Sequence, residues 1–472
     1  MRVVLEVVEG KHKGKKFAFD RHSTFMVGRA PKVHFQIPGD VYFSRHHFMI
    51  EVNPPRVFLR DLGSSNGTVV NGKKLARDNL QTVLKDGDVI HGGRTSLRVS
   101  VEGQQDVPEH ALSASDSPGG ADTAPTRAIK MNGVKSDTKV LFAEGAGSRG
   151  KALRCIYCGK LAEDTQLGDL AASRILVHVC KSCRDKTRTK AQPIPNYEIL
   201  DELGRGTLGP VFRARRITTN RLVAVKPIPP HYIANRKAVK VFLREMCLGA
   251  RLSHPNIVSV LELGEAGTDL WIAMELVKGL NAAELAERAG GKLATSDAVD
   301  IGAQILGALD YAHSHSLVHR DVKPTNILVT GKRGAYKAKL SDFGLMKNFD
   351  EAGLSGITRQ GEVRGTVPFM PPEQVLDCRM VKPAGDIYGA GATLYWLLTG
   401  RYVYDFDARD KRGETKDPFL VILESDPIPI RKRSPEVPKS LARAIDIALR
   451  REPEDRYETA AQMAESLRAA AC

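Results

Sequence analysis

A glycine-rich stretch between two apolar runs places the tightest constraint on how the C-terminal part of this 472-residue chain can fold. Its characteristic residues are Leu203, Gly204, Gly206, Gly209 and Val211. Glycines let a β-hairpin close over an anion, because no Cβ atom keeps the backbone N–H groups away from the oxygens. On its own, such a stretch also fits a dinucleotide site or a plain turn. The motifs that follow it along the chain decide between these interpretations.

A lysine in a predicted strand follows the glycine-rich stretch. Lys226 comes two residues after Ala224 in an apolar segment, which favours a lysine held in a pocket over an ordinary surface lysine. There its ammonium can reach the phosphates of a nucleotide. Glu245 lies further on in a helical pattern and can pair with Lys226, although such a glutamate alone is more often a solvated helix charge.

Two further motifs contain the groups that phosphoryl transfer needs. Their polar residues are Asp321, Lys323 and Asn326, followed by Asp342 in an Asp-Phe-Gly sequence. Asp321 can accept a proton from a substrate hydroxyl, and Lys323 can offset charge on the migrating group. Asn326 and Asp342 provide oxygen ligands for Mg²⁺, a hard cation that also binds phosphates. Since the reaction forms little covalent bonding to the protein, catalysis rests on position and charge.

With these motifs in this order, residues 197–470 resemble the eukaryotic-like (Hanks-type) Ser/Thr protein kinases of bacteria. The resemblance implies a bilobal α+β fold, with an N-lobe at 197–277 and a C-lobe at 278–470. It implies transfer of the ATP γ-phosphate to serine and threonine hydroxyls, including those of the chain itself, with Mg²⁺ or alternatively Mn²⁺. To the ATP site it adds the gatekeeper Met274 and a hinge that runs from Glu275 to Val277.

The same resemblance implies structural roles in the C-lobe. Glu373 and Arg456 would form a buried ion pair, and Asp386 would brace the catalytic loop. Lys323 and Thr366 match the Ser/Thr branch of the family and not the Tyr branch, so we expect Ser/Thr specificity.

A regulatory phosphorylation site is predicted between Asp342 and Glu373. Kinases with an arginine directly before the catalytic aspartate, here Arg320, pair it with a phosphorylated residue of this loop. Thr358 or Ser355 is the predicted site, and phosphate there would order the loop by charge-assisted pairing.

Loop residues within the first 101 positions indicate an anion-binding β-sandwich. Short alternating apolar and polar runs, separated by Gly- and Asn-rich turns, are typical of an all-β domain. The candidate binding residues at these turns are Arg29, Ser44, Arg45, Ser65 and Asn66. The arginines can fork onto a phosphate, the serines can donate hydrogen bonds, and Asn66 can hold a peptide backbone. Each Asn-Gly turn alone is explained more simply as a hairpin turn.

Taken jointly, these residues make positions 1–101 resemble the forkhead-associated (FHA) domain. The resemblance implies an all-β sandwich that binds phosphothreonine peptides. His47 would be the structural histidine of the family, which braces a loop without touching the ligand. A reader of this kind could capture phosphorylated substrates or the phosphorylated chain itself, with the tether raising the effective concentration.

Two cysteine pairs lie between the predicted domains. Residues 102–150 are rich in Ser, Gly, Ala, Asp and Pro, and they predict a flexible linker. Residues 151–190 then contain two C-x2-C pairs, Cys155 with Cys158 and Cys180 with Cys183. Four thiolates at this spacing predict a small zinc ribbon with one structural Zn²⁺. The alternative is two redox-active or incidental dithiols.

Composition limits the remaining possibilities. Lys and Arg exceed Asp and Glu by 70 to 55, and this excess suits anionic partners without identifying them. The cysteine usage fits a reducing compartment, and no signal peptide or apolar run long enough for a membrane span is apparent, so we expect a cytoplasmic protein without membrane partners. A pseudokinase scaffold that works through its FHA domain is the main alternative function. A nucleic-acid regulator is disfavoured, because aromatic residues do not cluster near the basic ones.

Overall fold

The computed structural model describes residues 2–19, 23–53, 56–76, 80–102, 194–206, 209–228, 249–266, 269–343, 366–377, 381–409, 413 and 415–471. These residues belong to two compact units. The first comprises Met1–Gln104, Thr207–Gly209 and Pro227–Cys472, and the second comprises Gln105–Gly206 and Pro210–Lys226. Several predicted residues lie outside the described ranges: Cys155, Cys158, Cys180, Cys183, Glu245, Ser355 and Thr358.

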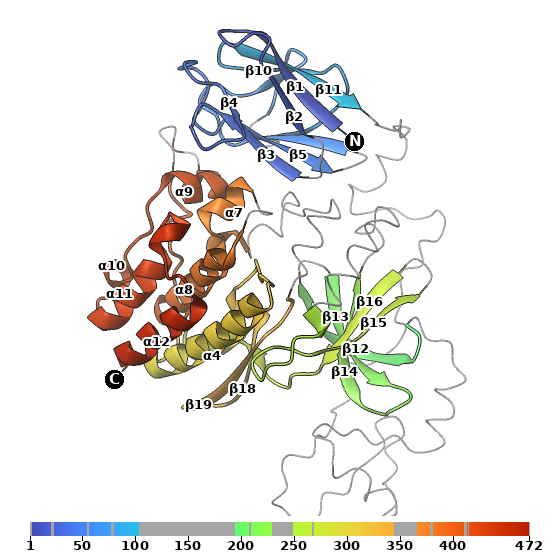
Figure 1. Cartoon of the computed structure of the whole chain (residues 1–472), viewed down its shortest axis with the longest axis vertical. Helices are drawn as coiled ribbons and strands as arrows, with labels where there is room; N and C mark the ends of the chain where they lie inside the picture. The colour runs from blue at the N-terminus through green and yellow to red at the C-terminus, as the bar shows by residue number, and fades with distance from the viewer. Residues whose placement is uncertain are drawn as a thin grey trace, which may run out of the picture. The chain divides into compact units, whose positions relative to one another are not determined.

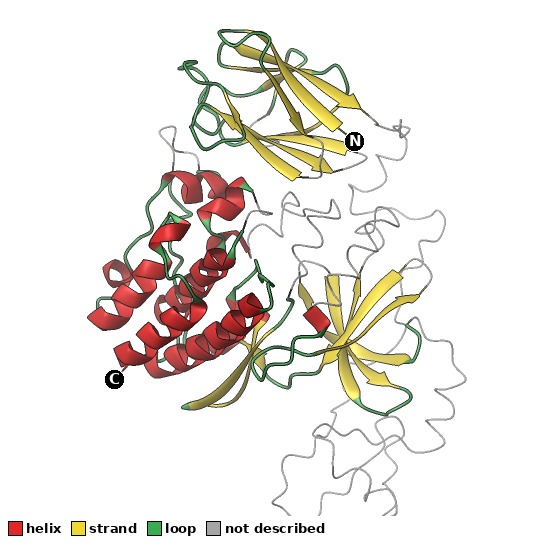
Figure 2. Cartoon of the chain, viewed as in Figure 1, coloured by secondary structure: helices red, strands yellow, loops and turns green. Residues whose placement is uncertain are grey.

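The N-terminal residues fold as a β-sandwich of two sheets, as the sequence predicts (Figure 2). The first sheet has the order β2-β1-β11-β10-β7-β8 and comprises β1 (Arg2–Glu9), β2 (Lys16–Phe19), β7 (Val69–Val70), β8 (Lys73–Lys74), β10 (Val89–Gly92) and β11 (Thr95–Glu102). The second has the order β4-β3-β5-β6-β9 and comprises β3 (Ser23–Gly28), β4 (Phe35–Gln36), β5 (Phe48–Asn53), β6 (Arg56–Asp61) and β9 (Gln81–Leu84).

Alternate side chains of these strands form the sandwich core. On β1, Val3, Leu5 and Val7 are fully buried, while the residues between them are only half-buried. On β6, Val57 and Leu59 point inward in the same way. A period of two residues puts every second side chain on one face of a strand, so one apolar face per sheet suffices to build the core.

The second unit is an antiparallel arrangement of β12 (Tyr197–Gly206), β13 (Gly209–Arg216) and β14 (Leu222–Ile228), which are consecutive in their sheet. β13 pairs with β14 from Phe212, opposite Val225, to Arg215, opposite Leu222. The Arg215 side chain is fully buried, and its Nε donates to Glu198 Oε2 of β12 at 2.8 Å. A buried guanidinium needs such a partner, so this pair helps to fix β12 beside β13.

The C-terminal part of the first unit begins with two strands and continues mostly as helices (Figure 1). β15 (Val260–Ala266) and β16 (Asp269–Glu275) form an antiparallel pair, and β17 (Leu280–Asn281), β18 (Ile327–Lys332) and β19 (Ala335–Leu340) form a small sheet. The helices are α3 (Ala282–Arg288), α4 (Thr295–Ser314), α7 (Pro372–Leu376), α8 (Pro383–Thr399), α9 (Pro418–Glu424), α10 (Ile430–Arg433), α11 (Lys439–Ala448) and α12 (Ala460–Ala471). Short 3-10 turns are η5 (Pro324–Asn326), η7 (Val367–Phe369) and η9 (Pro453–Asp455).

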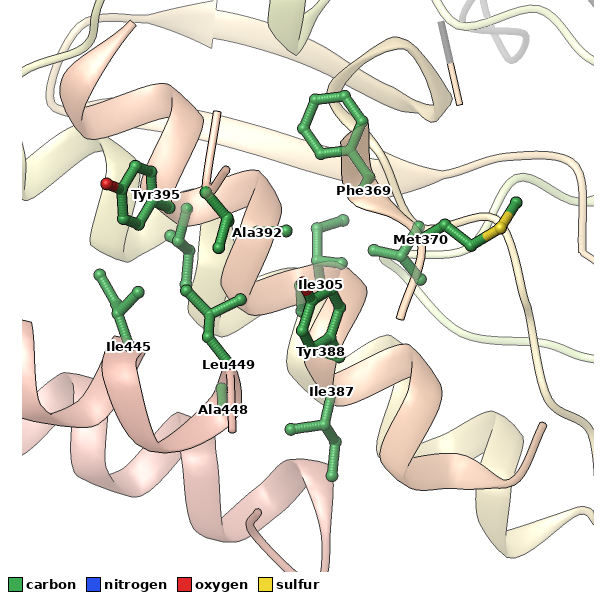
Figure 3. Packing of buried hydrophobic residues seen from close by; sticks show 14 of the residues in the cluster. Ile305, Phe369, Met370, Ile387, Tyr388, Ala392, Tyr395, Ile445, Ala448 and Leu449 are labelled. Atoms are coloured by element: carbon green, nitrogen blue, oxygen red, sulfur yellow. The ribbon is translucent and has the colours of Figure 1, made fainter. Parts of the chain in front are cut away.

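Helix α8 is the centre of the helical core. It is buried over most of its length and packs against α4 and α11 (Figure 3). Small residues allow the close approach: a Cβ atom on Gly302 of α4 would lie 2.6 Å from a methyl group of Leu394, and one on Gly391 would lie 2.9 Å from Ala448. A helix that is apolar on all sides is expected at such a position.

The predicted ion pair between Glu373 and Arg456 is confirmed. Arg456 Nη1 and Nη2 donate to the two carboxylate oxygens of Glu373 at 2.6 and 2.8 Å. Its remaining N–H groups donate to backbone oxygens, including that of Ala384 at 3.0 Å. The guanidinium also lies 4.9 Å from the ring centroid of Tyr388 on α8. The pair therefore links the segment after η9 to α7 and α8.

Among the described residues, no helix combines the length and the apolar character that crossing a lipid bilayer requires.

Candidate active site

A buried carboxylate of α8 holds the backbone of the catalytic loop through hydrogen bonds. Asp386 is 1% exposed, and its two oxygens accept hydrogen bonds from the backbone N–H groups of His319 at 2.8 Å and Arg320 at 2.7 Å. The predicted bracing role of Asp386 is thus confirmed. Burial by itself would raise the pKa of Asp386, but hydrogen bonds from His313 and His319 and the nearby imidazoles hold it below its usual value. The carboxylate stays charged and keeps the loop in place.

His319 joins the catalytic loop to the segment that carries Asp342. Its Nδ1 accepts from the backbone N–H of Asp321 at 3.2 Å, and its Nε2 lies 2.8 Å from the backbone oxygen of Ser341. The imidazole also contacts the Phe343 ring edge-to-face at 4.6 Å between centroids. This geometry positions the two acidic residues of the predicted site relative to each other.

Asp321, Lys323 and Asn326 are brought together as predicted. Lys323 Nζ lies 2.8 Å from Asp321 Oδ2, and Asn326 Nδ2 donates to the same oxygen at 2.9 Å. Lys323 Nζ also donates to Thr366 Oγ1 at 2.6 Å. Within the described part of the chain, no donor reaches Asp321 Oδ1. One carboxylate oxygen is therefore held, and the other is buried without a hydrogen-bond partner among the described residues.

A pocket opens beside Asp321. Its wall includes Arg320, Thr366, Phe369, Met370 and Gln374. Gln374 Nε2 donates to the backbone oxygen of Arg320 at 2.9 Å, which links α7 to the catalytic loop. The pocket is small, and its lining combines apolar residues such as Phe369 and Met370 with polar residues such as Arg320 and Thr366 next to the acidic group.

Backbone hydrogen bonding brings Asn326 near the segment that carries Asp342. The backbone oxygen of Asn326 accepts from the Ser341 N–H at 2.9 Å and from the Ser341 hydroxyl at 3.0 Å, and Asp342 is the next residue. Since Asn326 uses its amide N–H₂ to hold Asp321, its side-chain oxygen remains available as a ligand. A carboxylate and an amide oxygen form a donor set that suits Mg²⁺.

The remaining predicted ATP-binding residues divide between the two units. Leu203, Gly204, Gly206, Val211, Ala224 and Lys226 lie in the second unit, while Gly209, Met274, Glu275 and Val277 lie in the first. Lys226 on β14 is only 3% exposed, which agrees with the prediction that it is held in a pocket. Gly209 has a φ of +107°, a conformation that favours glycine. Gly204 faces open space on the side where a Cβ atom would stand.

A lysine that sequence reasoning missed anchors the predicted hinge. Lys339 Nζ on β19 donates to Glu275 Oε1 at 2.6 Å, and the backbone N–H of Ser259 donates to the same oxygen at 2.8 Å. The Glu275 N–H in turn donates to the Ser259 oxygen at 2.9 Å. The side chain of Glu275 is thus used to hold the hinge, which leaves its backbone to contact a ligand. The sequence contains no motif that would have indicated this pair.

In the sandwich, the predicted anion-binding residues gather at one end of the second sheet. The Arg29 N–H donates to the Ser44 oxygen at 3.1 Å, and the Ser65 N–H donates to Ser44 Oγ at 3.0 Å. Asn66 Nδ2 donates to the backbone oxygen of Tyr42 at 2.8 Å. Arg29, Arg45, Ser65 and Asn66 are exposed, so the cluster is open to a ligand.

Gly28 and His47 fix the shape of this cluster. A Cβ atom on Gly28 would lie 2.0 Å from the backbone oxygen of Arg45, so only glycine lets the two loops approach. His47 is fully buried, and its Nδ1 accepts from the Ser44 N–H at 3.0 Å. Burial lowers the pKa of His47 to about 4, against the opposing effects of Asp61, Asp40 and the Gly67 backbone. The predicted loop-bracing role of His47 is confirmed.

Comparison with known proteins agrees with both assignments. Residues 197–467 match the protein kinase domain family, and residues 25–93 match the FHA domain. The chain is 34% identical over 275 residues to the serine/threonine-protein kinase PrkC of Bacillus subtilis, which covers 58% of this chain and 40% of the relative. It is 32% identical over 272 residues to the probable serine/threonine-protein kinase PknB of Lactococcus lactis, which covers 57% and 40%.

A third relative is the serine/threonine-protein kinase PknK of Mycobacterium tuberculosis, 36% identical over 298 residues that cover 60% of this chain and 25% of the relative. The chain thus spans less than half the length of each of these relatives. The kinase match, by contrast, takes in more than half of this chain and contains Asp321, Lys323, Asn326 and Asp342. The chain belongs to the protein kinase family and carries an N-terminal FHA domain.

Proposed function

We propose that this protein transfers the γ-phosphate of ATP to serine and threonine hydroxyls of proteins, including its own, and that its FHA domain binds phosphothreonine peptides. The single observation that supports the proposed phosphoryl transfer is the hydrogen bonding of the Asp321 carboxylate. Lys323 and Asn326 hold its Oδ2, while its buried Oδ1 has no hydrogen-bond partner among the described residues, and Asp321 itself lines a pocket. A carboxylate held in this way can accept a hydroxyl proton.

The other residues of the site have roles that follow from their chemistry. Lys323 offsets negative charge on the migrating group. Asn326 and Asp342 are the ligands for Mg²⁺, with Mn²⁺ as an alternative, and this metal neutralises charge on the nucleotide phosphates when it is bound. The proposed ATP site is completed by the glycine-rich stretch, Lys226 with Glu245, and the hinge beyond Met274.

Substitution of Thr366 tests the proposed specificity for serine and threonine. Thr366→Val removes the hydroxyl that accepts from Lys323 Nζ, so we expect kcat for a serine peptide to fall by about 10-fold, because a hydrogen bond to a charged group is lost. Thr399→Val is the matched control, since Thr399 Oγ1 bonds only backbone atoms of α8 and the following turn. A protein that phosphorylates tyrosine peptides as fast as serine peptides would contradict the proposal.

The FHA part rests on the cluster of Arg29, Ser44, Arg45, Ser65 and Asn66, in which all but the half-buried Ser44 are exposed. Arg29→Ala should abolish most of the affinity for a phosphothreonine peptide, because a fork of two N–H donors to the phosphate is lost. Arg98→Ala, on the outer part of β11, is the control. Fluorescence anisotropy measures both, and equal affinities of the Arg29→Ala variant and the unsubstituted protein would contradict this part.

We further propose a zinc ribbon at residues 151–190 with Cys155, Cys158, Cys180 and Cys183 as ligands, supported by their paired spacing. Elemental analysis of the purified protein should give one zinc per chain, and Cys155→Ser should lower this value while Cys378→Ser does not. An unsubstituted protein without zinc would contradict the proposal.

The remaining proposals concern regulation and location. Thr358 or Ser355 is the proposed activating phosphosite, and mass spectrometry that finds no phosphate on residues 343–365 of the active protein would contradict it. The proposed domains are 1–101, 151–190 and 197–470, with 102–150 as linker. The cysteine usage supports a cytoplasmic location.

A further inference from the structure

Strands β3 and β5 in the second sheet of the FHA domain are buried on both faces. Phe25 and Ile50 face the sandwich core, yet their neighbours Met26 and Met49, which are opposite each other on β3 and β5, are only 1% and 2% exposed. The outer face of an antiparallel sheet commonly faces water. Two buried methionines on that face must therefore be covered by another part of the molecule.

This partner is the C-lobe of the same chain. Met26 and Met49, together with Ala30, Val33 and Leu62, belong to the continuous apolar cluster of the C-terminal helices and not to the sandwich core. Strand β3 contacts α7. The FHA domain and the C-lobe therefore belong to one compact unit.

Polar contacts hold α9 to the FHA domain at both of its ends. At the start of α9, Arg60 Nη2 donates to Asp417 Oδ2 at 2.8 Å, and its guanidinium lies 5.5 Å from the ring centroid of Phe419. At the last residue of α9, His46 Nδ1 lies 3.2 Å from Glu424 Oε1. These polar contacts accompany the apolar patch on Met26 and Met49, and interfaces commonly combine an apolar core with polar contacts.

The contact at Glu424 reaches the proposed phosphate-binding cluster. His46 directly follows Arg45, one of the two arginines proposed to hold the phosphate. Arg45 is close enough to Glu424 to act on its carboxyl: hydrogen bonding by His46 and the charges of His46, Arg45 and Lys416 lower the pKa of Glu424. The Glu424 carboxylate therefore interacts with some of the same positive charge that a bound phosphate would use.

We propose that the FHA domain docks on α7 and α9 of its own C-lobe and that this docking competes with the binding of a phosphothreonine peptide. The inference rests on the proposed phosphopeptide function of the FHA domain. A phosphate at Arg45 repels the Glu424 carboxylate, so each of the two events weakens the other. Because coupling between sites is reciprocal, a bound phosphopeptide releases α9 to the same extent that docking lowers peptide affinity.

Release of the FHA domain also bears on the active site. Helix α7 contains Gln374, which bonds the backbone of Arg320 and lines the pocket beside Asp321. Contact between β3 and α7 therefore places the docked domain against the helix that shapes the pocket. Phosphopeptide capture is thereby linked to the surface on which a protein substrate would be received.

Two variants separate docking from peptide contact. Arg60 lies on β6, away from the exposed binding loops, and Arg60→Glu breaks its pair with Asp417. Glu424→Gln removes the negative charge that competes with the phosphate. Both should bind a degenerate phosphothreonine peptide pool about 5-fold or more tightly than the unsubstituted full chain does. Glu436→Gln is the matched control, since the described partners of Glu436, Lys292 and Ser434, both belong to the C-lobe. Affinities of the two variants equal to that of the unsubstituted chain would overturn the proposal.

Hydrogen exchange of α9 provides a second readout. Addition of the phosphothreonine pool should raise exchange of residues 418–424 in the unsubstituted chain, and the same pool with plain threonine should leave it unchanged. In Arg60→Glu this exchange should be raised without peptide, and unchanged exchange there would overturn docking itself. If no form of the chain binds the phosphorylated pool, the proposed FHA function fails and the competition fails with it, whereas the exchange of Arg60→Glu still reports on docking.

Discussion

Acidification should loosen the phosphate-binding end of the FHA domain through a single residue, His47. Its Nδ1 accepts from the Ser44 N–H, so protonation of this nitrogen would break the bond that holds the loop. Burial lowers the pKa of His47 to about 4, whereas an unfolded histidine titrates near 6.5. The neutral form is therefore favoured by folding, and the unfolded chain binds the proton first as the pH falls.

The size of the effect follows from the interval between these two values. Stability from neutral His47 is fully present above about pH 6.5 and is lost as the pH falls from there toward 4. At about 1.4 kcal/mol for each pH unit, the loss amounts to about 2 kcal/mol at pH 5 and about 3 kcal/mol at pH 4. Losses of this size are a large part of the stability of a small domain.

Side-chain NMR titration and hydrogen exchange test this prediction. The titration should give a pKa near 4 for His47, and the free energy of opening of β5 amides should fall by about 2 kcal/mol between pH 7 and pH 5. His47→Gln keeps a hydrogen-bond acceptor but no titrating ring, so it should remove this pH dependence. Arg29→Ala, which leaves His47 in place, is the control and should retain it. A pKa above 6 for His47, or the same pH dependence in His47→Gln, would refute the reasoning.

Three further substitutions test other parts of the structure. Arg456→Leu leaves the Glu373 carboxylate without its buried partner, so the free energy of unfolding of the C-lobe should fall by about 3–5 kcal/mol in thermal unfolding; a fall below about 1 kcal/mol would show that the pair is not buried. Gly28→Ala forces a Cβ atom against the Arg45 backbone, so anisotropy should show at least about 10-fold weaker phosphothreonine binding with unchanged phosphorylation of a short peptide; unchanged binding would contradict the loop geometry. Lys339→Met removes the cation that holds the hinge carboxylate, so steady-state kinetics should show a higher KM for ATP with little change in kcat, and the reverse pattern would place Lys339 in another role.

Much of the active site could be predicted from the sequence, because its chemistry depends on residues that are close together along the chain. Asp321, Lys323 and Asn326 lie within six positions, so a single short loop can bring their side chains together. Asp386 and the Glu373–Arg456 pair were accessible only through the family resemblance. No local pattern indicates that residues so far apart in sequence meet.

The features that could not be predicted depend on the tertiary arrangement alone. In β3, the apolar Met26 between two core residues indicates burial on both faces but does not say what covers the second face. The contact of His46 with Glu424 joins positions 378 residues apart, and the sequence around each is unremarkable for a surface segment. The hinge pair of Lys339 with Glu275 could not be predicted either, since in the sequence each residue resembles an ordinary solvated charge.

Transfer of labelled phosphate from ATP with Mg²⁺ to the chain itself measures the central claim most directly. Asp321→Asn keeps the shape and the bonds from Lys323 and Asn326 but cannot accept a hydroxyl proton, so incorporation should fall by about 10² to 10⁴-fold. Asp300→Asn, an exposed aspartate on α4, should incorporate phosphate as the unsubstituted protein does. Equal incorporation by the unsubstituted protein and Asp321→Asn would contradict the account.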